Sequence, residues 1–119
     1  MILTDPEWSI MDVLWSGERF SLGEITKRLE PVQGWSRKTV FTYLTRMEGK
    51  GLVKIDRTQA EPYEAGVSRE ECAREEREKF LRKVYDGAAG DMIAAFLKEN
   101  RIPREEIEHL KKLLDEMEV

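Results

Sequence analysis

The stretch WSRKTVFTYLTRMEGKG, residues 35–51, constrains the fold most, because it predicts one short helix with two chemically different faces. The hydroxyl of Ser36 is placed to cap the helix start, and Gly51 is free to adopt the positive φ that ends many helices. Three apolar residues recur at helical spacing and predict a stripe that faces a core. This stripe consists of Val40, Leu44 and Met47.

The other faces of this helix are basic and rich in hydroxyl groups. They carry Arg37, Lys38, Thr42, Thr45 and Arg46. A helix that offers arginine, lysine and threonine to solvent, with few acids nearby, suits the major groove of DNA. An ordinary solvated helix surface would have a similar pattern, so the helix alone leaves both interpretations open.

The segments around this helix favour DNA contact. Residues 52–57 predict a strand, residues 58–62 a turn and residues 63–65 the returning strand, with Arg57 near the tip of the hairpin. Two capping boxes, Thr4 with Glu7 and Ser21 with Glu24, predict two earlier helices, and Pro31 and Gly34 are expected to break the chain before the third. Three helices followed by a hairpin predict a winged helix-turn-helix domain over residues 1–67.

Residues 68–119 predict a second, helical domain of three helices. A mostly charged helix leads towards Tyr85, glycines at 87 and 90 interrupt it, and the last helix carries a two-heptad apolar seam. So short a segment rarely buries enough surface to be stable alone, so we expect it to form a homodimer, although the seam could instead pack within one chain. The predicted dimerisation residues are Phe80, Val84, Met92, Ile93, Phe96, Leu97, Ile107, Leu110, Leu114 and Met117. The predicted fold class is mainly α with a small β-hairpin.

The charge balance argues against nucleic-acid binding at first sight, since the net charge is −4 and the pI is near 5.2. The distribution of charged residues along the chain weakens this objection. Residues 31–58 hold six basic and two acidic residues, a local net charge of +4, whereas residues 67–119 hold fourteen acidic and eleven basic residues. No apolar run is long enough to span a membrane and no signal peptide is apparent, so we expect a cytoplasmic protein.

Little in the sequence indicates catalysis. Cys72 is the only cysteine and His109 the only histidine, so no nucleophilic triad, cysteine metal cluster or cofactor motif is formed. Packing is favoured over redox sensing for Cys72, and a surface position for His109. The three tryptophans are expected to be structural, with Trp8 and Trp15 packed in the core and Trp35 at the staple position before the basic helix. Of Phe41 and Tyr43, one should pack and the other lie exposed, where an aromatic ring can touch a thymine methyl group.

Four segments resemble the penicillinase and methicillin-resistance repressors of the BlaI/MecI type. They are LTDPEWSIMDVLW, WSRKTVFTYLTRMEGKGLV, KVYDGAAGDMIAAFLKEN and EEIEHLKKLL. The resemblance implies a homodimeric repressor, without a cofactor, that binds double-stranded operator DNA of pseudo-palindromic sequence. It further implies that bases and phosphates are contacted through Lys38, Thr39, Thr42 and Arg46, with Ser36 near the DNA backbone and the wing around Arg57 against phosphate.

This chain departs from the family pattern at the start of the basic helix and in the C-terminal part. Arg37 replaces a proline, and Phe41 stands where the best-known members carry arginine, so the family's operator sequence is not carried over. The family is switched by a protease that cuts an Asn-Phe bond after a membrane receptor senses β-lactam. The aligned pair is Ala95-Phe96, which is the candidate proteolytic site. The cysteine pairs of the copper-responsive branch are missing.

The sequence therefore predicts a dimeric winged-helix transcriptional repressor whose DNA-binding residues are Ser36, Arg37, Lys38, Thr39, Phe41, Thr42, Arg46 and Arg57. The main alternative is a winged-helix module for protein interaction that no longer reads DNA, for which the acidic pI is the best argument. An enzyme is a more distant third interpretation.

Overall fold

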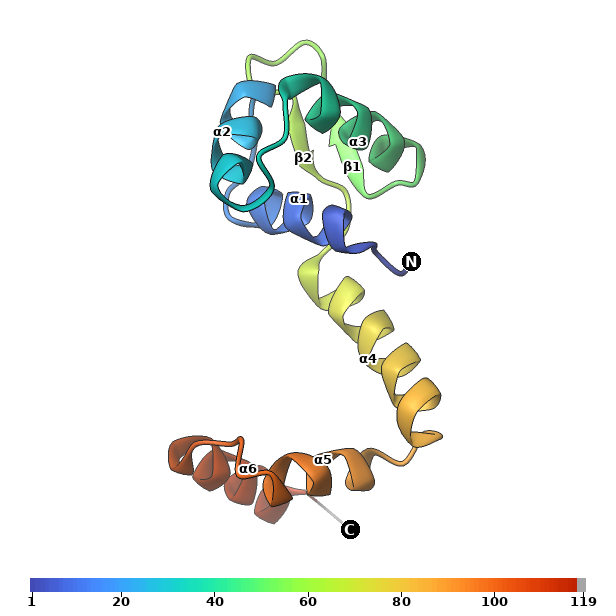
Figure 1. Cartoon of the computed structure of the whole chain (residues 1–119), viewed down its shortest axis with the longest axis vertical. Coiled ribbons are helices and arrows are strands. Elements are labelled where there is room, and N and C mark those ends of the chain that lie inside the picture. The colour runs from blue at the N-terminus through green and yellow to red at the C-terminus, as the bar shows by residue number, and fades with distance from the viewer. Residues whose placement is uncertain (118–119) are drawn as a thin grey trace. The chain divides into compact units, whose positions relative to one another are not determined.

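The computed structural model describes residues 1–117 and contains six helices and one antiparallel hairpin (Figure 1). It divides into two compact units, Met1–Glu76 and a second that begins at Arg77. The predicted fold class, mainly α with a small β-hairpin, is confirmed. The two units divide within a helix, and the domain boundary after residue 67 stays a prediction.

The first two helices begin at the predicted capping boxes. In α1 (Asp5–Trp15) and α2 (Leu22–Gln33), the cap hydroxyl accepts from the third backbone N–H and the glutamate side chain accepts from the cap N–H. The predicted break at Pro31 is wrong, because α2 continues through it and ends only at Gly34, whose φ is +64°. Proline removes a single backbone hydrogen bond in this last turn, and the N–H of Gly34 closes the helix on the carbonyl of Glu30 at 3.0 Å.

Helix α3 (Arg37–Gly49) supplies the centre of the core. Val40, Leu44 and Met47 are fully buried, as their spacing predicts, and they join apolar residues of α1, α2 and the hairpin. The tryptophans pack around this core rather than inside it, with Trp8 and Trp15 in edge-to-face contact at 5.5 Å between ring centroids. Their predicted structural role is thereby supported.

The hairpin consists of β1 (Val53–Ile55) and β2 (Tyr63–Ala65), with Lys54 opposite Glu64. The first strand is shorter than the predicted 52–57. Beyond β2 the sheet gains one bridge, because Phe20 and Tyr63 exchange two backbone hydrogen bonds of 2.9 and 3.0 Å. This bridge therefore joins the segment between α1 and α2 to β2, the second strand of the hairpin.

The C-terminal unit contains the end of α4 (Arg69–Tyr85), α5 (Ala89–Lys98) and α6 (Arg104–Glu116). The interruption lies at Asp86 and Gly87, both at positive φ, and not at Gly90, which is helical. No side chain between residues 77 and 117 is buried. No described helix of the chain is both long and apolar enough to cross a membrane.

One ion pair with a buried carboxylate ties the first helix to the residue after α3. The Glu7 side chain is only 5% exposed and accepts from the Nζ of Lys50 at 2.7 Å and from the N–H of Thr4 at 2.9 Å. Burial alone would raise the pKa of Glu7, but the hydrogen bonds from Lys50 and Thr4 outweigh burial and hold it below its ordinary value. The charged pair is therefore a net stabilising element above the ordinary pKa of a glutamate.

We predict that Glu7→Gln lowers the free energy of unfolding at pH 7 by about 1–2 kcal/mol, because a charge-assisted hydrogen bond to a partly exposed lysine is lost. The pKa of Glu7 is lower in the folded protein than in the unfolded chain. The difference in the free energy of unfolding should therefore be largest above the pKa of the unfolded chain, and it should vanish as the pH falls through the pKa of the folded protein. Urea unfolding of both proteins between pH 7 and pH 3 measures it.

Asp12→Asn is the matched control, because Asp12 pairs with Arg69 at 2.7 Å but both side chains are more than half exposed. Its effect should stay below about 0.5 kcal/mol at every pH. If Glu7→Gln lowers the free energy of unfolding by the same amount at pH 7 and at pH 3, the stabilisation does not come from the charge of the Glu7 carboxylate.

Candidate nucleic-acid interface

The start of α3 is fixed by its cap. The Ser36 hydroxyl oxygen accepts from the N–H of Thr39 at 3.3 Å, and the same hydroxyl donates to the Thr39 side chain at 3.2 Å. Ser36 and Thr39 are therefore already bonded to each other in the free protein. They hold the first turn in place, with Ser36 exposed at its edge.

The outward face of α3 carries hydroxyl groups whose donors are occupied. Thr42 donates to the carbonyl of Lys38 at 2.9 Å, and Thr45 donates to the carbonyl of Phe41 at 3.0 Å. Both threonines are exposed. Because these hydroxyl hydrogens point back to the helix, the threonines offer oxygen lone pairs and methyl groups to a ligand.

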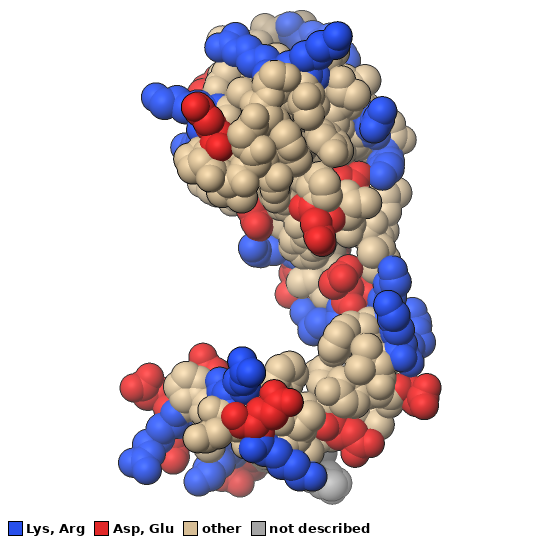
Figure 2. Space-filling view, viewed as in Figure 1, with Lys and Arg blue, Asp and Glu red and all other residues tan. Residues whose placement is uncertain are grey.

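Two of the six bases in residues 31–58 are neutralised by acids of the same unit. Lys50 pairs with Glu7, and Arg57 lies 3.4 Å from the carboxylate of Glu48. Among the described residues, Lys38 and Arg46 have no ion-pair partner and are exposed. Figure 2 shows Lys and Arg atoms gathered at the top of this unit, where Figure 1 places the hairpin loop and the start of α3. Of the four basic residues in 31–58 that have no ion-pair partner among the described residues, three (Arg37, Lys38 and Arg46) lie on α3 and one, Lys54, lies on β1.

A shallow hollow of about 290 Å³ lies along one side of this face. It is lined by Lys38, Thr39, Thr42, Tyr43 and Arg46. Four of these five residues were predicted to contact DNA, so the structure brings them together. Tyr43 was not in that set, and its ring stacks on Trp35 at 4.9 Å between centroids.

Phe41 is the exposed member of the aromatic pair that the sequence left open. It is 51% exposed, whereas Tyr43 packs against the core. Arg37 lies elsewhere, because its guanidinium approaches Gly23 so closely that a β-carbon there would be 2.9 Å from a nitrogen. Arg37 thus lies against the first turn of α2 while remaining exposed.

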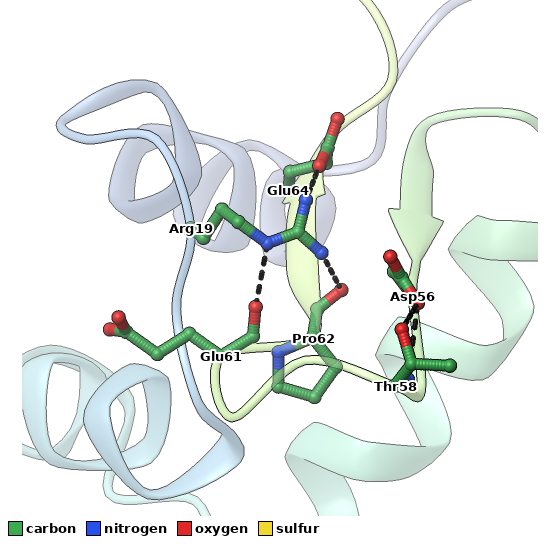
Figure 3. A network of polar contacts seen from close by, with 6 residues as sticks. All are labelled: Arg19, Asp56, Thr58, Glu61, Pro62 and Glu64. Atoms are coloured by element: carbon green, nitrogen blue, oxygen red, sulfur yellow. Dashed lines mark hydrogen bonds and ion pairs between the residues drawn. The ribbon is translucent and has the colours of Figure 1, made fainter.

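The wing is held by Arg19, whose role the sequence did not predict (Figure 3). Its Nε donates to the carbonyl of Glu61 at 2.8 Å, one terminal nitrogen donates to the carbonyl of Pro62 at 3.0 Å, and the other pairs with the carboxylate of Glu64. Three contacts from one guanidinium fix the returning strand. Nothing local in the sequence signals them, because the partners lie more than forty residues further along the chain.

The hairpin loop, residues 56–62, carries two acidic residues, Asp56 and Glu61, although it was predicted to contact phosphate. Hydrogen bonds from the Thr58 hydroxyl and N–H keep the pKa of Asp56 below its ordinary value (Figure 3). A hydrogen bond with Glu24 and the negative charge of Glu24 raise the pKa of Glu61. Arg57 is therefore the one base in residues 56–62, and it is shared with Glu48.

The described residues hold no group of three or more histidine, cysteine or acidic side chains that could bind a metal. Cys72 is buried in the core, and burial raises the pKa of its thiol, so packing is its role in this structure. His109 is exposed on α6.

The chain is 27% identical to the methicillin resistance regulatory protein MecI of Staphylococcus aureus strain N315 over 116 residues, which cover 95% of this chain and 93% of that protein. It is likewise 27% identical to the penicillinase repressor of Bacillus licheniformis over 115 residues, covering 96% and 90%.

Among solved structures, a MarR/EmrR family transcriptional regulator from Acinetobacter sp. ADP1 matches with a TM-score of 0.44 and 21% sequence identity, covering 90% of this chain and 78% of that one. The family model described as penicillinase repressor matches residues 3–116, nearly the whole chain. The family comprises transcriptional repressors and not enzymes, which confirms the predicted non-enzymatic role. This chain belongs to the penicillinase repressor family.

Proposed function

We propose that the protein is a sequence-specific transcriptional repressor that occupies a pseudo-palindromic operator as a homodimer. The observation that carries the proposal is the exposed, unneutralised basic face of α3, in a chain that belongs to a repressor family. The helix is 13 residues long and projects its bases from a packed three-helix core, which is the arrangement in which helix-turn-helix proteins enter the major groove. Repression then follows from occupancy of the promoter by a protein in the cytoplasm.

The residues of this face have different tasks in the proposed complex. Lys38 and Arg46 both line the hollow and supply charge for phosphates and donors for base edges. Thr39 and Thr42 line the same hollow. Ser36 and Arg37, at the helix start, are placed for the DNA backbone, where contacts fix the register of the protein without selecting sequence.

Arg57 enters the complex only after a local exchange of partners. In the free protein it is paired with Glu48, and its side chain is 68% exposed. A DNA phosphate would replace that carboxylate, so Glu48 competes with DNA for the wing arginine. Such exposed pairs are weak, so the exchange costs little.

The dimer is proposed from the apolar surface of the C-terminal unit. Phe80, Val84 and Phe96 are each about half exposed, and the seam residues Leu114 and Met117 are more than 60% exposed. A unit without any buried described side chain has no core of its own, and a second copy would supply one. The remaining predicted contact residues are Met92, Ile93, Leu97, Ile107 and Leu110.

Relief of repression by a regulatory protease would follow from cleavage at Ala95-Phe96 in α5. The bond lies inside a helix, so a protease needs local unfolding of α5, which the weakly buried C-terminal unit would permit. Cleavage would detach α6 together with the end of α5, and with them six of the ten proposed dimerisation residues. Among the relatives, MecI is named for the regulation of methicillin resistance, and antibiotic resistance regulation is the proposed setting for this chain.

The alternative is a winged-helix module for protein interaction, favoured by the net charge of −4 and by the neutralised wing. An acidic module would not bind DNA tightly at physiological salt. The two functions therefore differ in salt dependence and in sequence selection.

The proposed function predicts that the full-length protein enriches a two-fold symmetric motif from a randomised duplex library. On that motif, Arg46→Ala should weaken binding by about tenfold or more and flatten the dependence of affinity on salt. Fluorescence anisotropy between 50 and 300 mM salt, roughly the range in which phosphate contacts are resolved, measures both effects.

Arg104→Ala removes the same charge from α6 and should bind normally. If the library yields no motif, and weak binding disappears as salt rises, the interaction module becomes the better function.

The competition at the wing predicts that Glu48→Gln binds the operator about two- to fivefold more tightly at low salt, because Arg57 is released and a repulsive charge is removed. The same substitution in an Arg57→Ala background separates the two causes. In the Arg57→Ala background, Glu48→Gln should increase operator affinity by less than it does in the otherwise unchanged protein. An equal gain in both backgrounds would mean that the Glu48–Arg57 pair does not restrain the wing.

The dimer predicts that a chain ending after Ala95 becomes monomeric in analytical ultracentrifugation. Its operator affinity should fall by about a hundredfold, because the two half-sites no longer share an effective concentration. In the full-length chain, Leu114→Ser should weaken self-association, whereas Lys112→Ser on the same helix should not. If the truncated chain still dimerises and binds as tightly as the intact one, the proposed dimer surface is wrong.

A further inference from the structure

Phe41 is an exception among the aromatic side chains of the N-terminal unit. Residues 1–76 are all described, and within them Phe41 is the one aromatic residue classed as exposed, with 51% of its surface accessible. The other rings lie in the core or pack against it. A phenylalanine ring has no atom that donates or accepts a conventional hydrogen bond, so this surface gains free energy only from an apolar contact.

The position of Phe41 places that apolar surface within the DNA-binding face. Lys38 precedes it by three residues and Thr45 follows it by four, so all three are neighbours on one side of α3. The Thr45 hydroxyl donates to the carbonyl of Phe41 itself, and Thr42 donates likewise to the carbonyl of Lys38. The middle of the face therefore offers a ring and methyl groups, with no free hydroxyl donor, while the charge comes from Lys38 and Arg46.

We propose that Phe41 is a specificity-determining residue that reads thymine through its 5-methyl group in the major groove. Thymine is the only base of DNA that presents a methyl group there, so an apolar side chain at this position selects it. This inference rests on the proposed function, and it assigns to each operator half-site a thymine that faces Phe41. The neighbouring basic residues, Lys38 and Arg46, hold α3 on the flanking phosphates.

The charge around Phe41 favours DNA over a protein as the occupant of this face. Lys38 and Arg46 have no ion-pair partner among residues 1–117, so the ligand must be anionic along the helix and apolar at one point. The thymine-containing major groove combines both properties. A protein partner would need an apolar side chain set among several acids.

The test replaces thymines of the selected operator one at a time by deoxyuridine, which removes the methyl group and leaves the hydrogen-bonding pattern unchanged. At one position in each half-site, we expect the affinity of the full-length protein to fall by about fourfold, the factor that corresponds to one buried methyl group at roughly 0.8 kcal/mol. Phe41→Ala should bind the thymine and deoxyuridine duplexes equally. Phe41→Leu, which keeps an apolar side chain, should retain part of the preference.

Val32→Ala is the matched control, because Val32 is an apolar residue of α2 that is 74% exposed, and its truncation should leave the thymine preference intact. The inference is overturned if the selected motif contains no thymine, if no deoxyuridine substitution changes affinity, or if Phe41→Ala keeps the full preference. In these cases the proposed function still stands, since a motif was selected and bound. Failure to select any motif overturns both.

Discussion

The burial of one stripe of α3 is the constraint on which the proposed site depends. Val40, Leu44 and Met47 are fully buried against α1, α2 and the hairpin, so the rotation of the helix about its own axis is set by the core. Once these side chains face inward, the helical period places Lys38, Thr42 and Thr45 on the opposite side. The core therefore determines the geometry of the proposed DNA-binding face without any contact to a ligand.

The two ends of α3 are fixed by different interactions. Ser36 caps the first turn, and Lys50, directly after the last, is held by the buried carboxylate of Glu7. A rotation or shift of α3 would expose the apolar stripe and separate a buried charge from its partner, which is costly. Such a helix is preorganised, so little ordering entropy is lost when it binds. Arg19 plays the corresponding part for the wing by fixing β2 (Figure 3).

Local sequence patterns predicted most of the fold and only part of the electrostatics. The capping boxes, the apolar stripe and the hairpin could be read from neighbouring residues, because each depends on contacts within a few positions. Pro31 and Gly90 were predicted to interrupt helices, but each lies inside one, because a proline or glycine near a helix end removes little helix stability. The pairing of Lys50 with Glu7 spans 43 residues, and that of Arg19 with Glu64 spans 45. No local signal distinguishes such a neutralised base from a free one.

The net charge of −4 is a poor guide to how this protein meets DNA. At physiological salt a charge is screened beyond roughly 8 Å, so the acids that a bound duplex experiences are those close to α3 and the hairpin loop. Near α3 the free bases dominate, and near the loop Glu48 and Asp56 offset Arg57. The long-range attraction to any DNA is thus weak, while the proposed short-range contacts of α3 are unaffected. Weak nonspecific attraction raises the ratio of specific to nonspecific binding, which is the quantity that matters for a repressor in a genome full of competing sites.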